Sequence, residues 1–306
     1  MIGTRALRVE HETAYDYPAR VDLAYHIAYL RPAETPYQDV TQFGLEIDPL
    51  PTHRSAGRDA FGNQRDVFSL YGPHDKLRVR AVSNVRVAPR FDALDLESSP
   101  PWSEVAGDMR YEAGAPFQPE TEFVFGSPFV PLLPVLRHYA TSSFPAARPL
   151  LAGAIDLMRR VHADFVYDAD STDVSTPLAV AFAQRRGVCQ DYAHVSIGAL
   201  RALGLPAAYV SGYLLSTPPA GQQRLIGADA SHAWVRVWCP VNGWVDFDPT
   251  NDCFVGSGHV TLALGRDYGD VAPLRGVIRG GGRHAVAVAV SVLPIEDPVL
   301  ADGGVS

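Results

Sequence analysis

The first 90 or so residues alternate between apolar and polar positions in short runs, such as Leu7-Val9-His11 and Leu77-Val79-Ala81. Successive side chains of a strand point to opposite faces, so this alternation predicts strands with one buried face. Turn signals such as Asp48-Pro49 and Tyr71-Gly72-Pro73 separate the runs. Many short strands with frequent turns predict a β-rich N-terminal domain over residues 1–90, with a β-sandwich-like architecture.

Helical patterns dominate the middle of the chain. Residues 91–145 are richer in proline, serine and acids and predict a connector that carries short helices. Apolar spacing then predicts a helix over residues 147–162. Another is expected from Thr176-Pro177, because threonine caps helix N-termini and proline suits the first helical position. A third begins at Cys189 and ends at Gly204.

Strand patterns return after the third helix, over residues 207–215, 232–239, 244–248 and 285–293. Helices followed by a run of antiparallel strands predict an α+β fold class. The sequence therefore divides into the β-rich domain, the connector, a core with its C-terminal strands at residues 146–295, and a tail at residues 296–306.

Composition limits the classes of function. Hydrophobic residues make up 47% of the chain and charged residues 20%, which is typical of a globular protein. The net charge of −8 argues against a nucleic-acid groove or an anionic membrane surface as partner. No apolar stretch approaches the roughly 20 residues of a membrane span, and the start lacks the pattern of a secretory signal. We therefore expect a cytoplasmic protein.

Cys189 is the first residue with a candidate chemical role. It lies at the start of the third expected helix, in Arg186-Gly187-Val188-Cys189-Gln190-Asp191. The N–H groups and dipole of a helix N-terminus stabilise a thiolate, which favours a nucleophile. The alternative is a small buried hydrophobic residue, the usual role of an isolated cysteine.

His232 and Asp248 complete a candidate set. His232 begins a strand whose other face is apolar, and Asp248 ends the next strand. As a base for Cys189, His232 would hold the thiolate as an ion pair and protonate the leaving group, with Asp248 orienting the imidazole. A structural histidine is the alternative reading of His232.

The length of the turn between these two strands tests whether His232 and Asp248 can meet. A two-residue Asn242-Gly243 hairpin would place His232 and Asp248 on opposite faces of the sheet. The hypothesis therefore predicts a turn of three or five residues, or a bulge, in spite of the Asn-Gly signal.

The Cys/His/Asp order carries a resemblance to a known family. The relevant blocks are Gly187-Val188-Cys189-Gln190-Asp191-Tyr192-Ala193-His194, Gly204-Leu205-Pro206-Ala207, Tyr209-Val210-Ser211-Gly212-Tyr213, His232-Ala233-Trp234 and Gly243-Trp244-Val245-Asp246-Phe247-Asp248-Pro249-Thr250. Together they resemble the bacterial branch of the transglutaminase-like superfamily, over about residues 150–255. Two further sets resemble the β-domain and the C-terminal continuation that accompany this core: His11-Glu12-Thr13 with Asp59-Ala60-Phe61-Gly62-Asn63, and His259-Val260 with Gly265-Arg266-Asp267-Tyr268.

The resemblance implies a papain-like core, in which a helix carries the cysteine against an antiparallel sheet that carries His and Asp. It maps Cys189 to the nucleophile, His232 to the base and Asp248 to the orienting carboxylate. Val188 before the cysteine and Gln190-Asp191 after it depart from the animal transglutaminases. The resemblance therefore implies acyl transfer through a thioester more strongly than it implies protein cross-linking.

Other residues near these motifs have open roles. The backbone N–H of Cys189 is the natural oxyanion donor, and Gln184 is either a second donor or a solvated helix residue. Asp191 is expected to be structural or to shape the site, since the helix dipole favours a carboxylate in the first turn. The remaining candidates either line the cleft or belong to the core: Gln190, Tyr213, Trp234 and Trp244.

Metal chemistry is the rival hypothesis. Cys239, Cys253 and His259 lack the short ligand spacings of zinc modules, and no glycine-rich phosphate loop has the required context. We therefore expect neither a metal nor a cofactor.

The sequence favours a thiol-dependent acyl-transfer enzyme that hydrolyses peptide or isopeptide bonds. The expected partner is a peptide or protein substrate, or a small amide. A protein-glutamine transamidase and an inactive peptide-binding module are the alternatives.

Overall fold

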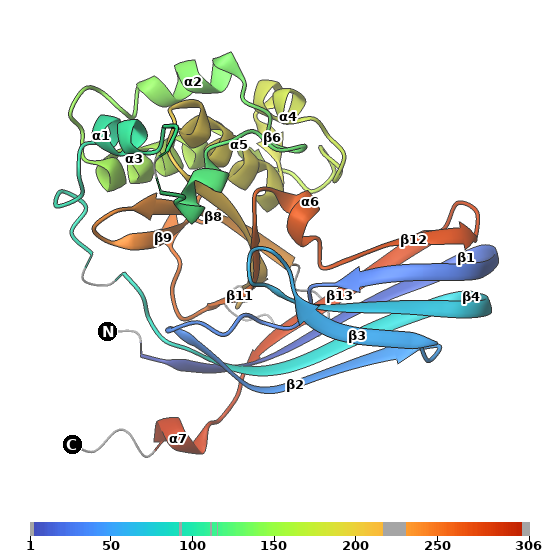
Figure 1. Ribbon diagram of the computed structural model, residues 1–306. Helices are drawn as coiled ribbons and strands as arrows, with labels where there is room; N and C mark the ends of the chain where they lie inside the picture. Colours follow the sequence, from blue (N-terminus) through green and yellow to red (C-terminus); the bar gives the residue numbers. More distant parts are fainter. Residues whose placement is uncertain (1–2, 92–93, 111, 115, 217–230, 302–306) are drawn as a thin grey trace.

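Two antiparallel sheets organise the chain, and a group of helices packs against one face of the second sheet (Figure 1). The structure is a computed structural model that describes residues 3–91, 94–110, 112–114, 116–216 and 231–301. Residues 302–306 of the expected tail lie outside the described residues.

The first sheet has six strands in the order β12-β1-β4-β2, with β13 also on β1 and β3 also on β4. These strands are β1 (Arg5–Ala28), β2 (Gln38–Asp48), β3 (His53–Arg58), β4 (Gln64–Val87), β12 (Leu274–Gly280) and β13 (Ala285–Pro294). The strand-rich N-terminal region predicted from the alternation is therefore confirmed.

The β-sandwich-like architecture expected for this region takes the form of one sheet, whose two longest strands carry an irregularity. β1 and β4 are each 24 residues long, and their register shifts between Asp16 and Val21. Apolar residues from both sides of the shift, including Phe68 and Val79, share one buried cluster. The irregularity interrupts the alternation, so two long strands look like several short ones in the sequence.

The C-terminal strands differ from the expected division of the chain. The sequence pattern grouped residues 146–295 into one core, but β12 and β13 pair with β1 of the first sheet. Leu7 is opposite Pro294 and Asp16 is opposite Ala285. An alternating pattern identifies a strand but not its partner, so the sequence pattern could not predict this pairing.

Within the described part of the chain, the second sheet has five strands in the order β10-β9-β8-β7-β11. They are β7 (Ala207–Leu214), β8 (Ser231–Cys239), β9 (Gly243–Asp248), β10 (Cys253–Phe254) and β11 (His259–Gly265). β5 (Val166–Tyr167) and β6 (Arg186–Gly187) form a short parallel pair, and β6 lies just before the third predicted helix in the chain.

Most of the described helices lie between β4 and β7 in the chain. The described helices are α1 (Trp102–Asp108), the 3-10 helix η1 (Pro119–Phe123), α2 (Pro134–Thr141), α3 (Leu150–Asp164), α4 (Leu178–Gln184), α5 (Cys189–Ala202), α6 (Tyr268–Val271) and α7 (Pro298–Ala301). Among the described residues, no helix is long and apolar enough to cross a membrane.

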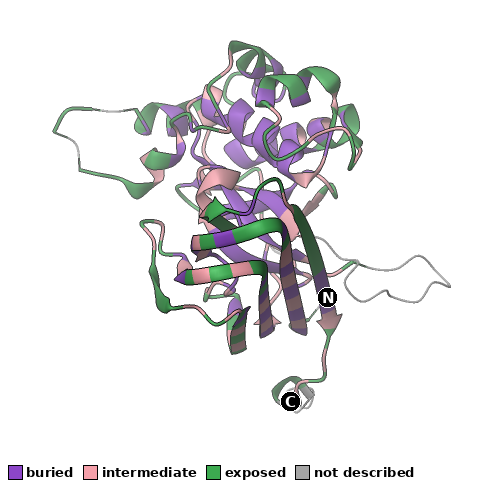
Figure 2. Cartoon of the chain, turned by 90° about the vertical axis from the view of Figure 1, so that its right-hand side faces the viewer, coloured by how far each residue is buried: buried purple, intermediate pink, exposed green. Residues whose placement is uncertain are grey.

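α5 is the central helix of the core and is almost entirely buried (Figure 2). Val195 and Ala199 share a hydrophobic cluster with Val235 and Val237 of β8. The helix ends just before Gly204, which has a φ of 87° that suits glycine. The predicted start and end of this helix are confirmed.

Buried polar side chains join the two sheets. Asn63, from the loop before β4, donates its Nδ2 to the carbonyl of Leu264 at 2.7 Å and accepts the N–H of Leu264 at 2.7 Å. Gln38 of β2 bonds both backbone groups of Thr261 in the same way, at 2.8 Å each. Each carboxamide thus replaces a strand partner at the edge of β11.

Replacing Asn63 by leucine tests this connection. Asn63→Leu leaves the N–H and carbonyl of Leu264 without these partners, and each unpaired buried group costs about 1–3 kcal/mol. We expect the free energy of unfolding in urea to fall by about 2–4 kcal/mol. Asn84→Leu is the control, because Asn84 bonds only an exposed Gln42 side chain through its amide, and should change it by about 0.5 kcal/mol. An equal loss in both variants would contradict the role of Asn63.

Candidate active site

The N-terminus of α5 holds Cys189 in a fixed turn. Asp191 accepts the N–H of Val188 at 2.9 Å and the hydroxyl of Thr172 at 2.7 Å through the same Oδ2. A Cβ on Gly187 would lie 2.3 Å from this oxygen, so only glycine fits there. Asp191 therefore shapes the turn that presents Cys189, and burial raises the pKa of its carboxyl.

The sulfur of Cys189 lies beside the start of β8. Cys189 is half-buried, and its Sγ is 3.9 Å from the carbonyl oxygen of Ser231, the residue before His232. His232, the next residue of β8, is therefore the base of this strand that lies close to the sulfur. The carbonyl of Val188 accepts the N–H groups of Asp191 and Tyr192, so the N–H groups ahead of Asp191 are the donors that the N-terminus of α5 can direct toward this region.

The connection between β8 and β9 has the odd length that the hypothesis requires. Cys239 is the register partner of Gly243, so residues 240–242 form a three-residue turn. Directly opposed residues of an antiparallel pair point the same way, which puts His232 and Asp248 on one face. The prediction made against the Asn-Gly signal is confirmed.

His232 and Asp248 are in direct contact. His232 Nε2 lies 2.7 Å from Asp248 Oδ2, which leaves Nδ1 as the ring nitrogen available to Cys189. Burial disfavours the charged imidazolium, but hydrogen bonds and charges from Asp248 and Cys189 outweigh it and raise the pKa of His232 to about 10. At neutral pH this histidine is therefore a cation between two acidic groups.

Asp248 is fully buried and accepts five hydrogen bonds. Oδ1 accepts the backbone N–H groups of Thr250 and Asn251. Oδ2 accepts from His232, from the Asn251 side chain at 2.7 Å and from His259 at 3.2 Å. Burial alone raises the pKa of this carboxyl, but these donors more than offset it and lower the pKa below its usual value.

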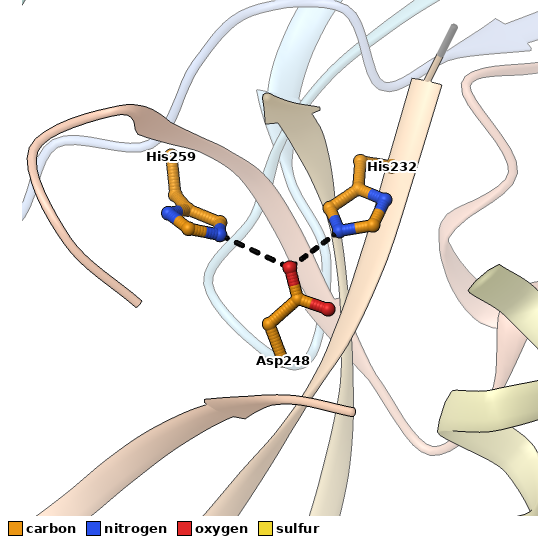
Figure 3. Close-up of side chains that lie close together, drawn as sticks. All are labelled: His232, Asp248 and His259. Atoms are coloured by element: carbon orange, nitrogen blue, oxygen red, sulfur yellow. Dashed lines mark hydrogen bonds and ion pairs between the residues drawn. The ribbon is translucent and has the colours of Figure 1, made fainter. Parts of the chain in front are cut away.

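His259 of β11 is a partner of Asp248 that sequence reasoning missed (Figure 3). Its Nδ1 accepts the N–H of Gly256 at 3.2 Å, so the proton of the neutral ring is on Nε2, which faces Asp248. The sequence drew attention to His259 through the His259-Val260 block of the family resemblance, as a residue that could close over the cleft and as a weak metal candidate, but none of these readings placed it on Asp248.

The same three side chains raise the question of a metal. One nitrogen of His232, one of His259 and one oxygen of Asp248 lie within 4.8 Å of one another. However, both imidazoles direct Nε2 at a single carboxylate oxygen at hydrogen-bond distance, and the Gly256 N–H occupies the other nitrogen of His259. A ligating nitrogen must have a free lone pair, so the arrangement fits a hydrogen-bonded carboxylate better than a metal centre.

Two other predicted residues pack close to this group. Trp234 is fully buried, donates Nε1 to Asp246 at 3.3 Å and meets the ring of His259 edge-on at 5.4 Å. Gln190 is buried in the first turn of α5 and donates its amide to the carbonyl of Val174 at 3.3 Å.

Three predicted residues lie elsewhere. Tyr213 is buried, and its hydroxyl bonds His11 of the first sheet at 2.9 Å. Trp244 lines a separate cavity at the opposite end of β9 from Asp248. Gln184 is exposed at the end of α4, as expected of a solvated helix residue.

Tyr167 is a second residue that sequence reasoning missed. It is the register partner of Gly187, two positions before Cys189, and is 55% exposed. Partial burial and the charge of a thiolate at Cys189 raise the pKa of its phenol. A pattern of only two strand residues gives no signal of this position in the sequence.

Comparisons with known proteins agree with this arrangement. Residues 7–86 match the family described as bacterial transglutaminase-like N-terminal region, and residues 138–249 match the transglutaminase-like superfamily. An uncharacterized protein of Mycobacterium tuberculosis is 39% identical, over 97% of this chain and 96% of the relative. A protein-glutamine gamma-glutamyltransferase of Pseudomonas aeruginosa is 37% identical over 112 residues, which are 34% of this chain and 16% of that protein.

A solved structure has the same fold. The crystal structure of a candidate cysteine protease from Cytophaga hutchinsonii matches with a TM-score of 0.74 and 18% identity, over 97% of this chain and 92% of that one. The expected fold class, an α+β transglutaminase-like core after a strand-rich N-terminal region, is confirmed.

The charge of His232 is open to direct measurement. Nitrogen-detected NMR of labelled histidines should give a pKa of about 10 for His232, because Asp248 stabilises its cationic form. Asp248→Asn removes this charge and should lower that pKa by about 1–3 units. His11 is the internal control, since burial holds its pKa at about 4 and Asp248 does not contact it. An unchanged His232 pKa in the variant would contradict the coupling.

Proposed function

Because the chain belongs to the transglutaminase-like superfamily, we propose that it is a cysteine acyl-transfer enzyme with a Cys189-His232-Asp248 triad. The observation that carries the proposal is the ionised, buried Asp248 on one nitrogen of His232, with Cys189 on the other side of the ring. A structural histidine also needs hydrogen-bond partners, but it does not need a thiol on one ring nitrogen and an ionised carboxylate on the other.

In the first step, the Cys189 thiolate attacks the carbonyl carbon of an amide. A C–S bond forms, and the carbonyl oxygen gains the negative charge of a tetrahedral intermediate. The backbone N–H of Cys189, at the N-terminus of α5, is the donor we assign to that oxygen. The C–N bond then breaks, and the imidazolium of His232 gives its Nδ1 proton to the departing amine.

In the second step, the thioester passes its acyl group to an acceptor. The now neutral His232 removes a proton from water, which attacks the thioester carbonyl and releases a carboxylic acid. The C–S bond breaks and the thiolate returns, paired again with the imidazolium. Asp248 stays ionised throughout, because its five hydrogen bonds stabilise the carboxylate.

Hydrolysis of a peptide or isopeptide bond is our first assignment, because water is always available as acceptor. Transamidation of protein glutamine is the second, and the activity named for the P. aeruginosa relative, which matches 34% of this chain, favours it.

A glutamine-containing peptide distinguishes these activities when ammonia, glutamate, shortened peptides and dansylcadaverine adducts are measured together. Ammonia with glutamate and no adduct indicates hydrolysis of the side-chain amide, shortened peptides indicate hydrolysis of a peptide bond, and a dansylcadaverine adduct indicates transamidation. No product from any tested amide, together with equal peptide binding by Cys189→Ala and wild type, would favour the binding module instead.

Selective alkylation tests the nucleophile without a known substrate. At about pH 6.5, two units below the pKa of a free thiol, iodoacetamide should label Cys189 alone. Burial raises the pKa of Cys253 to about 11, and Cys239 is buried, so both serve as internal controls. In His232→Ala, the Cys189 rate should fall at least about tenfold. Equal labelling of the three cysteines in the folded protein would contradict the triad.

A matched pair of substitutions tests whether His259 positions Asp248. His259→Gln retains a donor for Asp248 and an acceptor for the Gly256 N–H, whereas His259→Leu removes both. We expect His259→Leu to slow alkylation of Cys189 about tenfold, since hydrogen bonds to charged groups contribute about 1.5–3 kcal/mol. His259→Gln should stay near the wild-type rate.

The two variants must have similar thermal unfolding midpoints for the comparison to be valid. Similar rates in His259→Leu and wild type, or an equal loss in both folded variants, would exclude this role for His259.

A further inference from the structure

The Asp59-Ala60-Phe61-Gly62-Asn63 block has no part in the proposed chemistry, yet several side-chain hydrogen bonds fix its loop. Asp59 accepts the N–H groups of Phe61 and Asn63 at 2.9 Å each, and the Asn63 side chain at 2.8 Å. Asn63 in turn bonds both backbone groups of Leu264 in the second sheet. The loop thus holds the backbone at Phe61 next to the second sheet, where its ring contacts Phe123.

Phe61 forms one wall of an aromatic cavity of about 540 Å³. Its ring lies 5.5 Å from that of Phe123, which meets Trp244 at 5.3 Å and 83°. Phe117 also lines the cavity and is 72% exposed. A cavity of this size and lining is typical of small-molecule sites, which span about 300–1,000 Å³.

The charges around the cavity favour a cation. Glu120 and Glu122, from η1, line it together with Arg266. Asp270 accepts from the Arg266 guanidinium at 2.9 and 3.0 Å, which neutralises that positive charge. Two carboxylates and four aromatic rings therefore line the same cavity, and aromatic rings bind ammonium groups through their faces.

The cavity is separate from the candidate active site. Trp244 and Asp248 belong to the same strand, β9, and are four residues or about 13 Å apart. Cys189, His232 and Asp248 do not line the cavity.

We propose that this cavity, formed by Phe61, Phe117, Phe123, Trp244, Glu120 and Glu122, binds a small alkylammonium ligand. The cation lies against the ring of Trp244 and Phe61, close to the two carboxylates. Its apolar substituents cover the exposed Phe117. The site is independent of the triad, so it remains even where the proposed acyl transfer is wrong.

Two ligands of equal shape test the proposal. Choline carries a quaternary nitrogen where 3,3-dimethyl-1-butanol carries a neutral carbon. Calorimetric titration of the full chain should show saturable binding of choline and binding at least about tenfold weaker for the alcohol. Cys189→Ala should bind choline like the wild type, because the cavity lacks that residue. Equal affinity for the two ligands, or no binding of either, would overturn the proposal.

Substitutions locate the binding. Trp244→Leu should weaken choline about tenfold or more, since it removes the strongest cation–π partner. Phe61→Leu keeps an apolar side chain of similar reach and should weaken choline less. Glu120→Gln leaves the cavity walls intact and should also weaken choline, most clearly at low salt. Wild-type affinity in Trp244→Leu and Glu120→Gln together would show that choline binds elsewhere and would overturn the proposal.

Discussion

A buried negative charge is the constraint on which the candidate site depends. Removing a carboxylate from water costs several kcal/mol unless hydrogen bonds or opposite charges compensate it. Asp248 is fully buried, and donors from β8, β11 and the turn after β9 all converge on it. The fold therefore has to bring these elements together before the carboxylate can stay ionised. Its charge then keeps His232 protonated, which is the property that thiol chemistry requires.

A second buried charge connects the two sheets. Asp246 lies two residues before Asp248 and pairs with Arg236 of β8 at 2.6 Å and with Arg90 at 3.0 Å. Burial raises the pKa of its carboxyl, but the two guanidinium groups outweigh this and lower it. Arg90 follows β4 of the first sheet, so the N-terminal region contributes directly to the face that carries His232 and Asp248. The first sheet is thus part of the support of the site.

The local elements were predictable because their signals are local. Helix α5, with Cys189 at its start and Gly204 after its end, follows from spacing and capping alone. The three-residue turn between β8 and β9 followed from side-chain parity, once His232 and Asp248 were assumed to meet. The sequence pattern could not predict which distant segments pair or contact one another. The pairing of β13 with β1 and the contact of His259 with Asp248 both depend on tertiary packing, which no periodicity encodes.

The central claim is that Cys189 forms a thioester, and trapping that intermediate tests it most directly. The protein would be mixed with 4-nitrophenyl acetate, quenched in acid and analysed by peptide mass spectrometry. We predict one acetyl group on the peptide that contains Cys189, removed by neutral hydroxylamine and absent from Cys189→Ala. Acetylation to the same extent in Cys189→Ala, with none on Cys189 in the folded wild type, would contradict the account.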